Sequence, residues 1–278
     1  MALLGKVSRR FMPSVGLQNI NSLSKVYPPK IGLIPIFGGF HDGYTEIIKT
    51  SQKECDFVAV SLNTLSTQLT HKKYNIDLSG LYKYNIKKFI ELGVSHIYVS
   101  DIKNIKYFTY SCREKQKHSE YLTELCVVLN DGIRRINPDY VYYQYHELDE
   151  CREIVNMINF LKLPTQLRLT QPYRYNNNTV ASVRNYRLSD IEFKESSAIY
   201  DCLNTSIQTY KSPHDIKRSL HENILKYNFI KNEPEISITT FPSLNEIEEI
   251  IPNNPFTVSV EVQIGNGILK DNITSWRV

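Results

Sequence analysis

Residues 31–49, IGLIPIFGGFHDGYTEIIK, decide the fold class of this chain. The apolar run 31–36 predicts a buried strand, Gly38 and Gly39 interrupt it, and the pattern after His41 predicts an amphipathic helix. A helix that starts directly after a strand presents free backbone N–H groups, and its dipole favours a phosphate there. The stretch therefore predicts a nucleotide site. An ordinary strand-to-helix turn is the alternative that the local sequence leaves open.

Strand-like and helix-like segments continue to alternate after this stretch. Short apolar runs predict strands at 56–62, 94–99, 140–143 and 166–170, and helical patterns lie between them at 85–92, 114–136 and 149–161. Strands joined through helices pair in parallel with right-handed crossovers. The sequence therefore predicts an α/β fold around a parallel sheet.

The pattern changes after residue 188. Two helices are predicted over 190–210 and up to residue 227, followed by strand-like segments at 235–240, 243–250 and 256–264. We therefore predict two domains, 1–188 and 189–278, the second a small α+β unit.

Composition narrows the function classes. Lys+Arg 33 against Asp+Glu 29 gives a net charge of +4, too small to favour nucleic-acid binding without a basic face. No run approaches the roughly 18 apolar residues of a membrane helix, so we expect a soluble protein. The five cysteines stand singly without a C-x-x-C pair, which predicts neither a metal site nor a disulfide framework and favours the cytoplasm.

A turn-rich segment at 173–189 is the second candidate for an anion site. It carries Arg174, Ser182, Arg184 and Arg187, and guanidinium groups match phosphate oxygens well. An exposed hairpin with solvated arginines is the alternative.

The sequence resembles the pantothenate synthetase family, ATP-dependent ligases that join pantoate to β-alanine. Pro35, Gly38, His41 and Gly43 resemble the family's P-T-M-G-A-L-H-x-G-H segment, with Tyr44 in place of the second histidine. The likeness runs nearly end to end. Residues 56–61 resemble D-V-V-V-V-S, 138–143 resemble P-D-x-A-Y-F, 182–189 resemble S-S-R-N-x-Y-L-S, and 268–272 resemble R-L-I-D-N.

The resemblance implies a Rossmann-like nucleotide-binding domain with a C-terminal lid domain, ATP with Mg²⁺, small-molecule acid and amine substrates, and a possible homodimer. It implies an acyl-adenylate mechanism, in which the acid first attacks the α-phosphate of ATP. The site residues that it implies are catalytic His41, His146 and Arg184; ATP-binding Pro35, Gly38, His41, Gly43, Tyr44, Ser182 and Arg184; and substrate-binding Gln68 and Glu150.

The departures from the family pattern cluster in this site. His146 stands where the family has a phosphate-contacting lysine, and Gln144 stands where it has a glycine. His146 supplies charge only if its pKa lies near the working pH. Glu150 replaces a glutamine that contacts pantoate, and an ionised glutamate only accepts hydrogen bonds. A different acid, bearing an amine or an extra hydroxyl, is therefore as reasonable as pantoate, unless Glu150 simply faces solvent in the first turn of its helix.

Three functions stay open from the sequence. The leading prediction is the ATP-dependent ligase with pantoate and β-alanine. The second keeps the adenylating mechanism with another acid and amine. The third is a catalytically impaired relative that still binds nucleotide.

Overall fold

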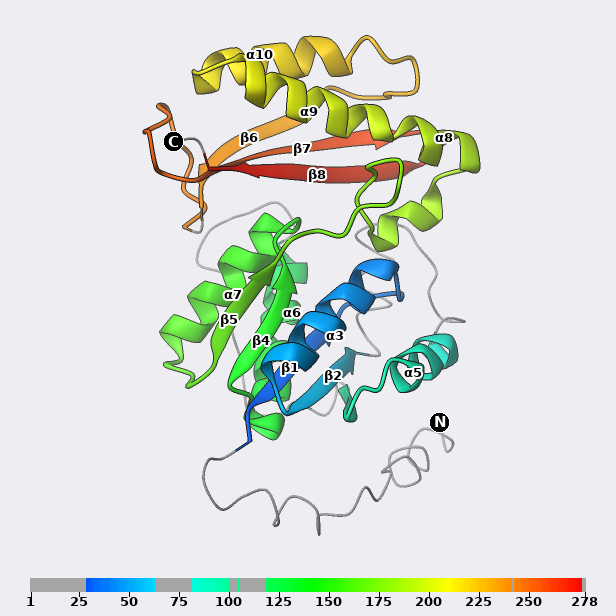
Figure 1. The fold of residues 1–278 in the computed structure, drawn as a ribbon, viewed down its shortest axis with the longest axis vertical. Helices are drawn as coiled ribbons and strands as arrows, with labels where there is room; N and C mark the ends of the chain where they lie inside the picture. Colours follow the sequence, from blue (N-terminus) through cyan, green and yellow to red (C-terminus); the bar gives the residue numbers. More distant parts are fainter. Residues whose placement is uncertain (1–28, 64–81, 101–104, 106–118, 242, 277–278) are drawn as a thin grey trace.

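A computed structural model of the chain describes residues 29–63, 82–100, 105, 119–241 and 243–276, and the structural statements below concern these residues. Two sheets lie one above the other along the long axis of the molecule (Figure 1). The lower sheet holds the first half of the chain, and the upper sheet holds the last strands.

The lower sheet has five strands in the order β3-β2-β1-β4-β5, and each neighbouring pair is parallel. Its strands are β1 (Ile31–Ile36), β2 (Phe57–Asn63), β3 (His96–Ser100), β4 (Tyr140–Gln144) and β5 (Gln166–Thr170). The α/β fold with a parallel sheet, predicted from the sequence, is confirmed.

Helices cover both faces of this sheet, as alternating strand and helix segments require. One apolar core joins the sheet to α3 (Asp42–Glu54) and α5 (Tyr82–Glu91). The other joins it to α6 (Ser119–Ile136) and α7 (Leu148–Phe160). The part of the helix predicted at 114–118 lies outside the described residues.

The strand order reverses between β1 and β4, which places a crevice at the carboxyl ends of these two strands. β1 follows β2 over six residue pairs, from Ile31↔Phe57 to Ile36↔Leu62. It pairs with β4 at only two positions, Gly32↔Tyr140 and Leu33↔Val141. Beyond these pairs, Pro35 and the residues after β1 line a cavity together with the end of β4. The sheet topology therefore places the site.

The second unit packs helices on one face of the antiparallel sheet β6-β7-β8. Its strands are β6 (Glu235–Thr240), β7 (Phe256–Ile264) and β8 (Gly267–Ser275), and its helices are α8 (Asp190–Glu195), α9 (Ser197–Thr209) and α10 (Pro213–Ile224). Leu203, Leu220 and Val258 are among the fully buried members of its core.

Three details of this unit differ from the sequence prediction. The helix predicted at 190–210 divides at Ser196, whose buried hydroxyl contacts Phe193 O at 2.7 Å and Thr179 Oγ1 at 2.8 Å. The segment 243–250 forms turns and a single bridge instead of a strand. β8 is not predicted from the sequence, because Lys270, Asp271 and Asn272 are three consecutive polar residues whose partners lie far away along the chain.

The polar face of the upper sheet is joined to the lower unit by side chains of β8. Asn272 Nδ2 donates to Tyr145 O at 3.0 Å, and Lys270 Nζ donates to Asp149 Oδ2 at 3.2 Å. The predicted boundary after residue 188 falls between the short 3₁₀ helix η3 (Val183–Arg187) and α8. The division into domains at that residue stays a prediction.

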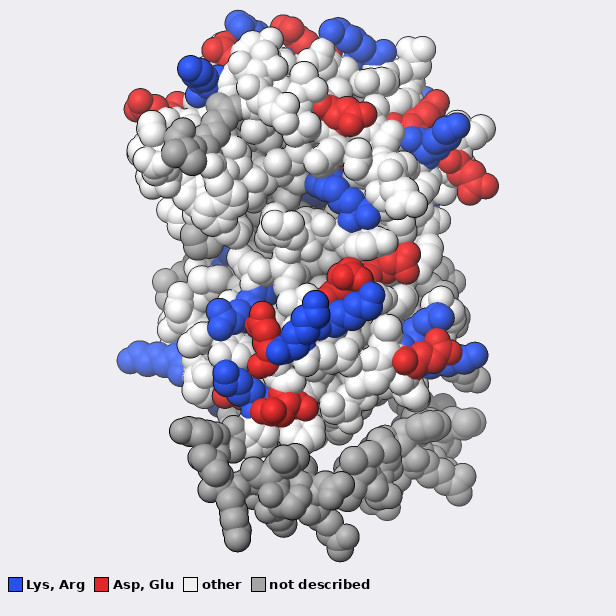
Figure 2. Space-filling view, viewed as in Figure 1, with Lys and Arg blue, Asp and Glu red and all other residues white. Residues whose placement is uncertain are grey.

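Within the described ranges, no helix is long and apolar enough to cross a membrane. Figure 2 shows basic and acidic side chains interspersed over the visible face.

Candidate active site

The loop after β1 is held in shape by two other elements. Gly38 has φ +134°, a backbone conformation that favours glycine. Asn85 of α5 is 3% exposed; its Oδ1 accepts from Phe40 N at 3.0 Å and its Nδ2 donates to Gly38 O at 3.3 Å. The hydroxyl of Tyr186 in η3 donates to Phe40 O. The loop is therefore fixed from both sides before any ligand binds.

His41 stands at the N-cap of α3 without capping the helix through its side chain. Its ring packs against Tyr44 with centroids 4.3 Å apart. Its Nδ1 is enclosed and finds no hydrogen-bond partner among the described residues. A buried polar atom without a partner is costly, so this nitrogen is available to a ligand.

Gly43 permits the close approach of His41 to the end of β4. A Cβ at this position would lie 2.8 Å from His41 Nδ1 and 2.9 Å from Gln144 Nε2. Gln144 Nε2 in turn donates to Gly43 O at 3.2 Å. Gln144, which departs from the family's glycine, thus closes the space between β4 and α3.

His146 and Glu147 follow β4 and face the Ser182–Arg184 segment. His146 is 6% exposed, its Nε2 lies 3.6 Å from Glu147 Oε1, and its Nδ1 has no hydrogen-bond partner among the described residues. Glu147 forms an ion pair with Arg184, which is only 2% exposed. The predicted phosphate-binding arginine is therefore already partly neutralised by a carboxylate.

Ser182 positions Arg184 through a capping box at the start of η3. Ser182 Oγ accepts from the backbone N–H of Arg184 at 3.3 Å and from its Nη1 at 3.2 Å. Asn185 Oδ1 accepts from Ser182 N at 2.6 Å. This local geometry directs the Arg184 side chain into the interior.

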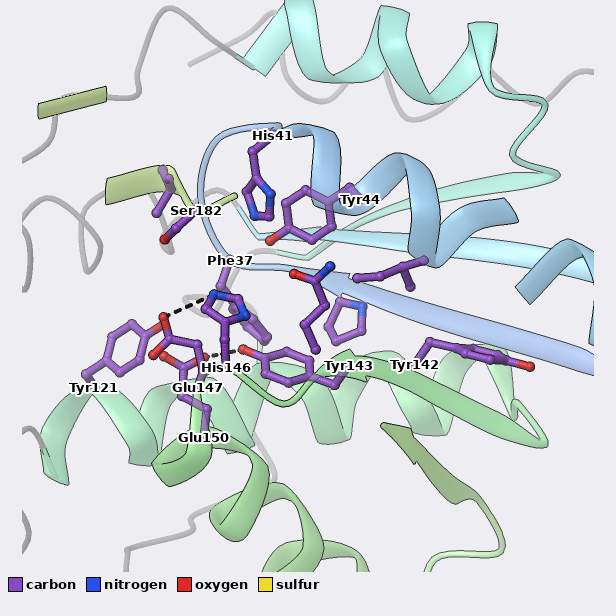
Figure 3. Close-up of a pocket in the computed structure, with 14 residues that line it drawn as sticks. Phe37, His41, Tyr44, Tyr121, Tyr142, Tyr143, His146, Glu147, Glu150 and Ser182 are labelled. Atoms are coloured by element: carbon purple, nitrogen blue, oxygen red, sulfur yellow. Dashed lines mark hydrogen bonds and ion pairs between the residues drawn. The ribbon is translucent and has the colours of Figure 1, made fainter. Parts of the chain in front are cut away.

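Glu150 lies one turn along α7 from Glu147 and is also directed inward. It is 3% exposed, and its Oε2 accepts a hydrogen bond from the Tyr143 hydroxyl. The solvent-facing alternative for Glu150 is therefore wrong. Figure 3 shows Glu147, Glu150 and His146 close to the rings of Tyr121 and Tyr143, with His41 and Tyr44 on the far side of the space.

Burial sets the charges of these groups. It lowers the pKa of His41 to about 3, assisted by His146 and Arg184 and opposed by Glu147. It lowers the pKa of His146 to about 4, with Glu147 opposing and Arg184 assisting. Burial, together with the carboxylates of Glu150 and Glu147, raises the pKa of Tyr44. Both imidazoles are thus neutral near pH 7, so the condition under which His146 would supply charge is not met.

The cavity enclosed by these groups is small. Its volume is about 40 Å³, and one water needs on the order of 10–15 Å³ of such space. The described lining residues are Pro35, Phe37, His41, Tyr44, Ile47, Tyr121, Tyr142, Tyr143, Gln144, His146, Glu147, Glu150, Ser182 and Val183. A nucleotide or an acid therefore enters this space only if lining side chains move.

The structure gathers most of the predicted site residues around this cavity. Pro35, His41, Tyr44, His146, Glu150 and Ser182 line the cavity, with Gly38, Gly43 and Arg184 directly beside these residues. Gln68 lies outside the described residues.

The prediction that three arginines form one anion site is wrong. Arg174 makes a bidentate ion pair with Asp271 at 2.7 and 2.8 Å, and Arg187 donates to Asn266 O at 3.3 Å. Only Arg184 of the three enters the site, because the turn-rich segment spreads these residues over the junction of the two units.

Sequence reasoning missed Asn85, Glu147 and Tyr143 as members of the site. Their partners lie on other elements, so no local motif marks them. Glu147 follows the His146 position directly, and its acidic character beside a predicted phosphate site was a signal that could have been used.

Within the described part of the chain, no group of three or more His, Cys, Asp or Glu side chains has the arrangement of a metal site. Mg²⁺ is commonly held by one or two carboxylates and substrate phosphates. A dedicated protein cage is therefore not required for an ion that arrives with a nucleotide.

Comparison with known proteins shows the family. The family model described as pantoate-beta-alanine ligase matches residues 16–274. The chain belongs to the pantoate-beta-alanine ligase family. Pantothenate synthetase of Thermosipho melanesiensis is 23% identical over 264 residues, covering 88% of this chain and 91% of that relative. The Clostridium botulinum pantothenate synthetase is 25% identical over 260 residues, covering 88% and 91%.

Solved structures of the family share the fold. Pantothenate synthetase from Thermus thermophilus has a TM-score of 0.73 at 16% identity, covering 91% of this chain and 96% of that one. The Francisella tularensis pantoate-beta-alanine ligase, complexed with beta-gamma ATP and beta-alanine, has a TM-score of 0.62 at 16% identity, covering 92% and 94%. The predicted family and the predicted enzyme class, an ATP-dependent amide-forming ligase, are confirmed.

Proposed function

We propose that this pantoate-beta-alanine ligase family member binds ATP and joins a carboxylic acid to an amine through an acyl adenylate, with pantoate and β-alanine as the default pair. The observation that carries the proposal is the pair of enclosed histidine Nδ1 atoms, on His41 and His146, beside buried Arg184. These polar atoms converge at the start of α3, where the helix dipole favours phosphate.

The proposed reaction has two balanced steps. A carboxylate oxygen of the acid attacks the α-phosphorus of ATP, and the bond to the bridging oxygen of pyrophosphate breaks. The neutral amine then attacks the carbonyl carbon of the acyl adenylate, AMP leaves, and the proton lost from nitrogen goes to solvent. Negative charge accumulates on phosphate oxygens in the first step, and donors placed there lower the barrier.

His41 and Arg184 are the proposed phosphate-stabilising groups. A guanidinium has five N–H donors, so Arg184 can keep Glu147 and still donate to a phosphate. Ser182 holds this guanidinium in place, and the backbone N–H groups near Gly43 complete the anion site. Tyr44 keeps its hydroxyl proton, because its pKa is raised, and is a donor. Gln68 is proposed to hold the acid, and it lies outside the described residues.

Mg²⁺ is proposed to arrive on the ATP phosphates. Glu147 is the carboxylate beside both His146 and Arg184, so it is the protein group that would hold the ion. The ion would neutralise the departing pyrophosphate. Glu147 would at the same time turn Arg184 toward the α-phosphate.

The uncharged His146 predicts slow catalysis. A hydrogen-bond donor without permanent charge stabilises phosphate less than an ammonium does. Loss of one such stabilising group typically lowers kcat by about 10²-fold or more. We therefore expect the uncharged His146 to weaken ATP binding less than it lowers the rate of adenylation.

The test is acid-dependent exchange of labelled pyrophosphate into ATP, together with ATP binding by calorimetry. Wild-type protein is expected to bind ATP and to catalyse exchange. His41→Ala should lower kcat/KM for exchange by about 10²-fold. The control His221→Ala, at an exposed histidine paired with Glu233, should leave the exchange rate unchanged.

Each other outcome has a defined meaning. Exchange that survives in His41→Ala refutes the site assignment. ATP binding without exchange for any acid identifies an impaired nucleotide-binding relative. No ATP binding at all rejects the proposal.

Two further expectations belong to this proposal. The described cysteines, Cys55, Cys126, Cys151 and Cys202, are buried free thiols, which supports a cytoplasmic location. A homodimer is expected from the resemblance to the family, and light scattering on the purified protein would measure it.

A further inference from the structure

Tyr186 joins the two segments that carry the proposed phosphate-stabilising groups. Its side chain extends from η3, and its hydroxyl donates a hydrogen bond to Phe40 O. This oxygen belongs to the peptide bond between Phe40 and His41. Arg184 lies in the same 3₁₀ helix as Tyr186. One hydrogen bond therefore ties the backbone next to His41 to the element that carries Arg184.

The 3₁₀ helix η3 is itself held in place at both ends. The capping box fixes its first turn. At its other end, Arg187 Nη2 donates to Asn266 O at 3.3 Å, in the turn between β7 and β8. Residues three apart in a 3₁₀ helix project from one side of it, so Tyr186 lies on the side of Val183, which lines the cavity. Tyr186 thus extends from a fixed element beside the site.

The turn-rich segment 173–189 also approaches the chain on the other side of His41. The ring of Tyr175 packs against Phe193 with centroids 5.3 Å apart. Burial and then the Asp42 carboxylate beside it raise the pKa of Tyr175 to about 12. The hydroxyl of Tyr175 therefore keeps its proton and can donate to that carboxylate. Both neighbours of His41 in the chain are thus contacted from this segment.

The contribution of Tyr186 comes mainly from its hydroxyl. The side chain is 51% exposed, so its ring buries little apolar surface. Asn85 of α5 holds the N–H group of Phe40, and Tyr186 holds the carbonyl group. Without the hydroxyl of Tyr186, the loop after β1 keeps its attachment to α5 but loses this attachment to η3.

We infer that Tyr186 is a positioning residue of the adenylating reaction, which fixes the separation between His41 and Arg184 so that both groups meet the same phosphate. Tyr186 is not among the described residues that line the cavity, so it acts through His41 and not on the substrate. The inference rests on the proposed function, because it assigns a residue to the same site.

Tyr186→Phe removes the hydroxyl and keeps the ring. It should lower kcat/KM for pyrophosphate exchange about 10-fold, the size of effect expected for one lost hydrogen bond, with thermal unfolding little changed. The matched control is Tyr227→Phe, because Tyr227 is also partly exposed and its hydroxyl faces Cys202 in the upper unit. This control should leave kcat/KM unchanged. An unchanged kcat/KM in Tyr186→Phe overturns the inference.

A double-mutant cycle with His41→Ala separates positioning from a general loss of stability. If Tyr186 acts through His41, Tyr186→Phe should change kcat/KM by less than about 2-fold in the His41→Ala protein, which is the range of independent errors in such cycles. An equal loss of about 10-fold with and without His41 means that the two residues act independently, and it overturns the inference.

The ring of His41 gives a readout that needs no catalysis. Its Cε1–H signal in proton–carbon NMR spectra, assigned by its loss in His41→Ala, should shift in Tyr186→Phe. The signal of His221, which is exposed and paired with Glu233, should stay in place. If no acid supports exchange, the proposed function fails, but a shifted His41 signal still supports the positioning role. A His41 signal that does not move overturns the inference.

Discussion

At the scale of single residues, the site depends on how closely side chains approach one another. His41, Gly43 and Gln144 lie so close that a side chain at Gly43 would overlap both of its neighbours. Glycine normally costs about 0.5–1 kcal/mol in a helix relative to alanine. Gly43 therefore lowers the stability of the helix but leaves the space that His41 occupies.

Gly43→Ala tests this interpretation. The added Cβ should displace the imidazole and lower kcat/KM for pyrophosphate exchange by about 10²-fold, by analogy with loss of one phosphate donor. Thermal unfolding should change little, because the better helix propensity of alanine offsets the displacement. Gly132→Ala in α6 is the control, since its Cβ would come no closer than 3.4 Å to Ser61 Oγ. Normal activity in Gly43→Ala would contradict this role.

The neutral histidine His146 predicts a pH effect on stability. Its pKa is about 4 in the folded protein, against the ordinary histidine value of 6.5 that applies to the unfolded chain. The unfolded chain therefore binds the proton first as pH falls. The contribution of neutral His146 to the free energy of unfolding is therefore complete above pH 6.5. It is lost as the pH falls from 6.5 toward 4, by up to about 1.4 kcal/mol per pH unit.

Urea unfolding at pH 7, 6 and 5 would measure this loss. His146→Gln, which does not titrate, should lose less free energy of unfolding than wild type over the same interval. Parallel pH dependence in the two proteins would show that His146 is not the responsible group.

At the scale of elements, α5 acts as a support for the loop that follows β1. Asn85 satisfies one donor and one acceptor of that loop, at Phe40 and Gly38. Backbone groups that lose such a partner in a buried place cost about 1–3 kcal/mol each. The helix therefore holds the loop through one amide side chain.

Asn85→Ala should lower the free energy of unfolding by about 2–6 kcal/mol, since two backbone groups lose their partner, and raise the KM for ATP more than it lowers kcat. Both effects are expected because the loop after β1, without Asn85, no longer holds His41 in position. Denaturant unfolding and exchange kinetics give the two quantities. Asn204→Ala on α9, whose side chain bonds Gln208 in its own helix, is the control, and an equal effect of both variants would rule out the supporting role.

At the scale of the whole molecule, the upper sheet lies over the site and is tied to it by polar contacts. Lys270 bonds Asp149 at the start of α7, three residues after His146. Lys270 is largely buried, whereas Asp149 is half exposed, so the stabilising effect of the pair is small. We expect its main effect on the relative placement of the two units.

Lys270→Met should raise the KM for ATP about 3- to 10-fold with a smaller change in kcat, while unfolding changes by less than about 1 kcal/mol. Lys270→Arg should restore the KM. Lys88→Met is the control, because its partner Glu91 lies on the same helix. A KM unchanged in Lys270→Met would show that this contact does not help nucleotide binding.

The sequence by itself determined the succession of strands and helices along the lower unit. It also determined the glycine turn after β1 and the position of His41 at the start of the following helix. These depend on periodicity and on local backbone preferences, which act over a few residues. The same local rules failed for β8, for the break at Ser196 and for the shared arginine site, because each depends on partners far along the chain.

Only the tertiary structure decided which charged groups meet. Arg184 pairs with Glu147, Arg174 pairs with Asp271, and Glu150 turns inward. The direction of a side chain and its partner depend on how whole elements pack, and burial then sets whether a histidine or a carboxylate keeps its charge. The stretch 31–49 therefore predicts the kind of site, and the packing of other elements around it decides which charged groups the site contains.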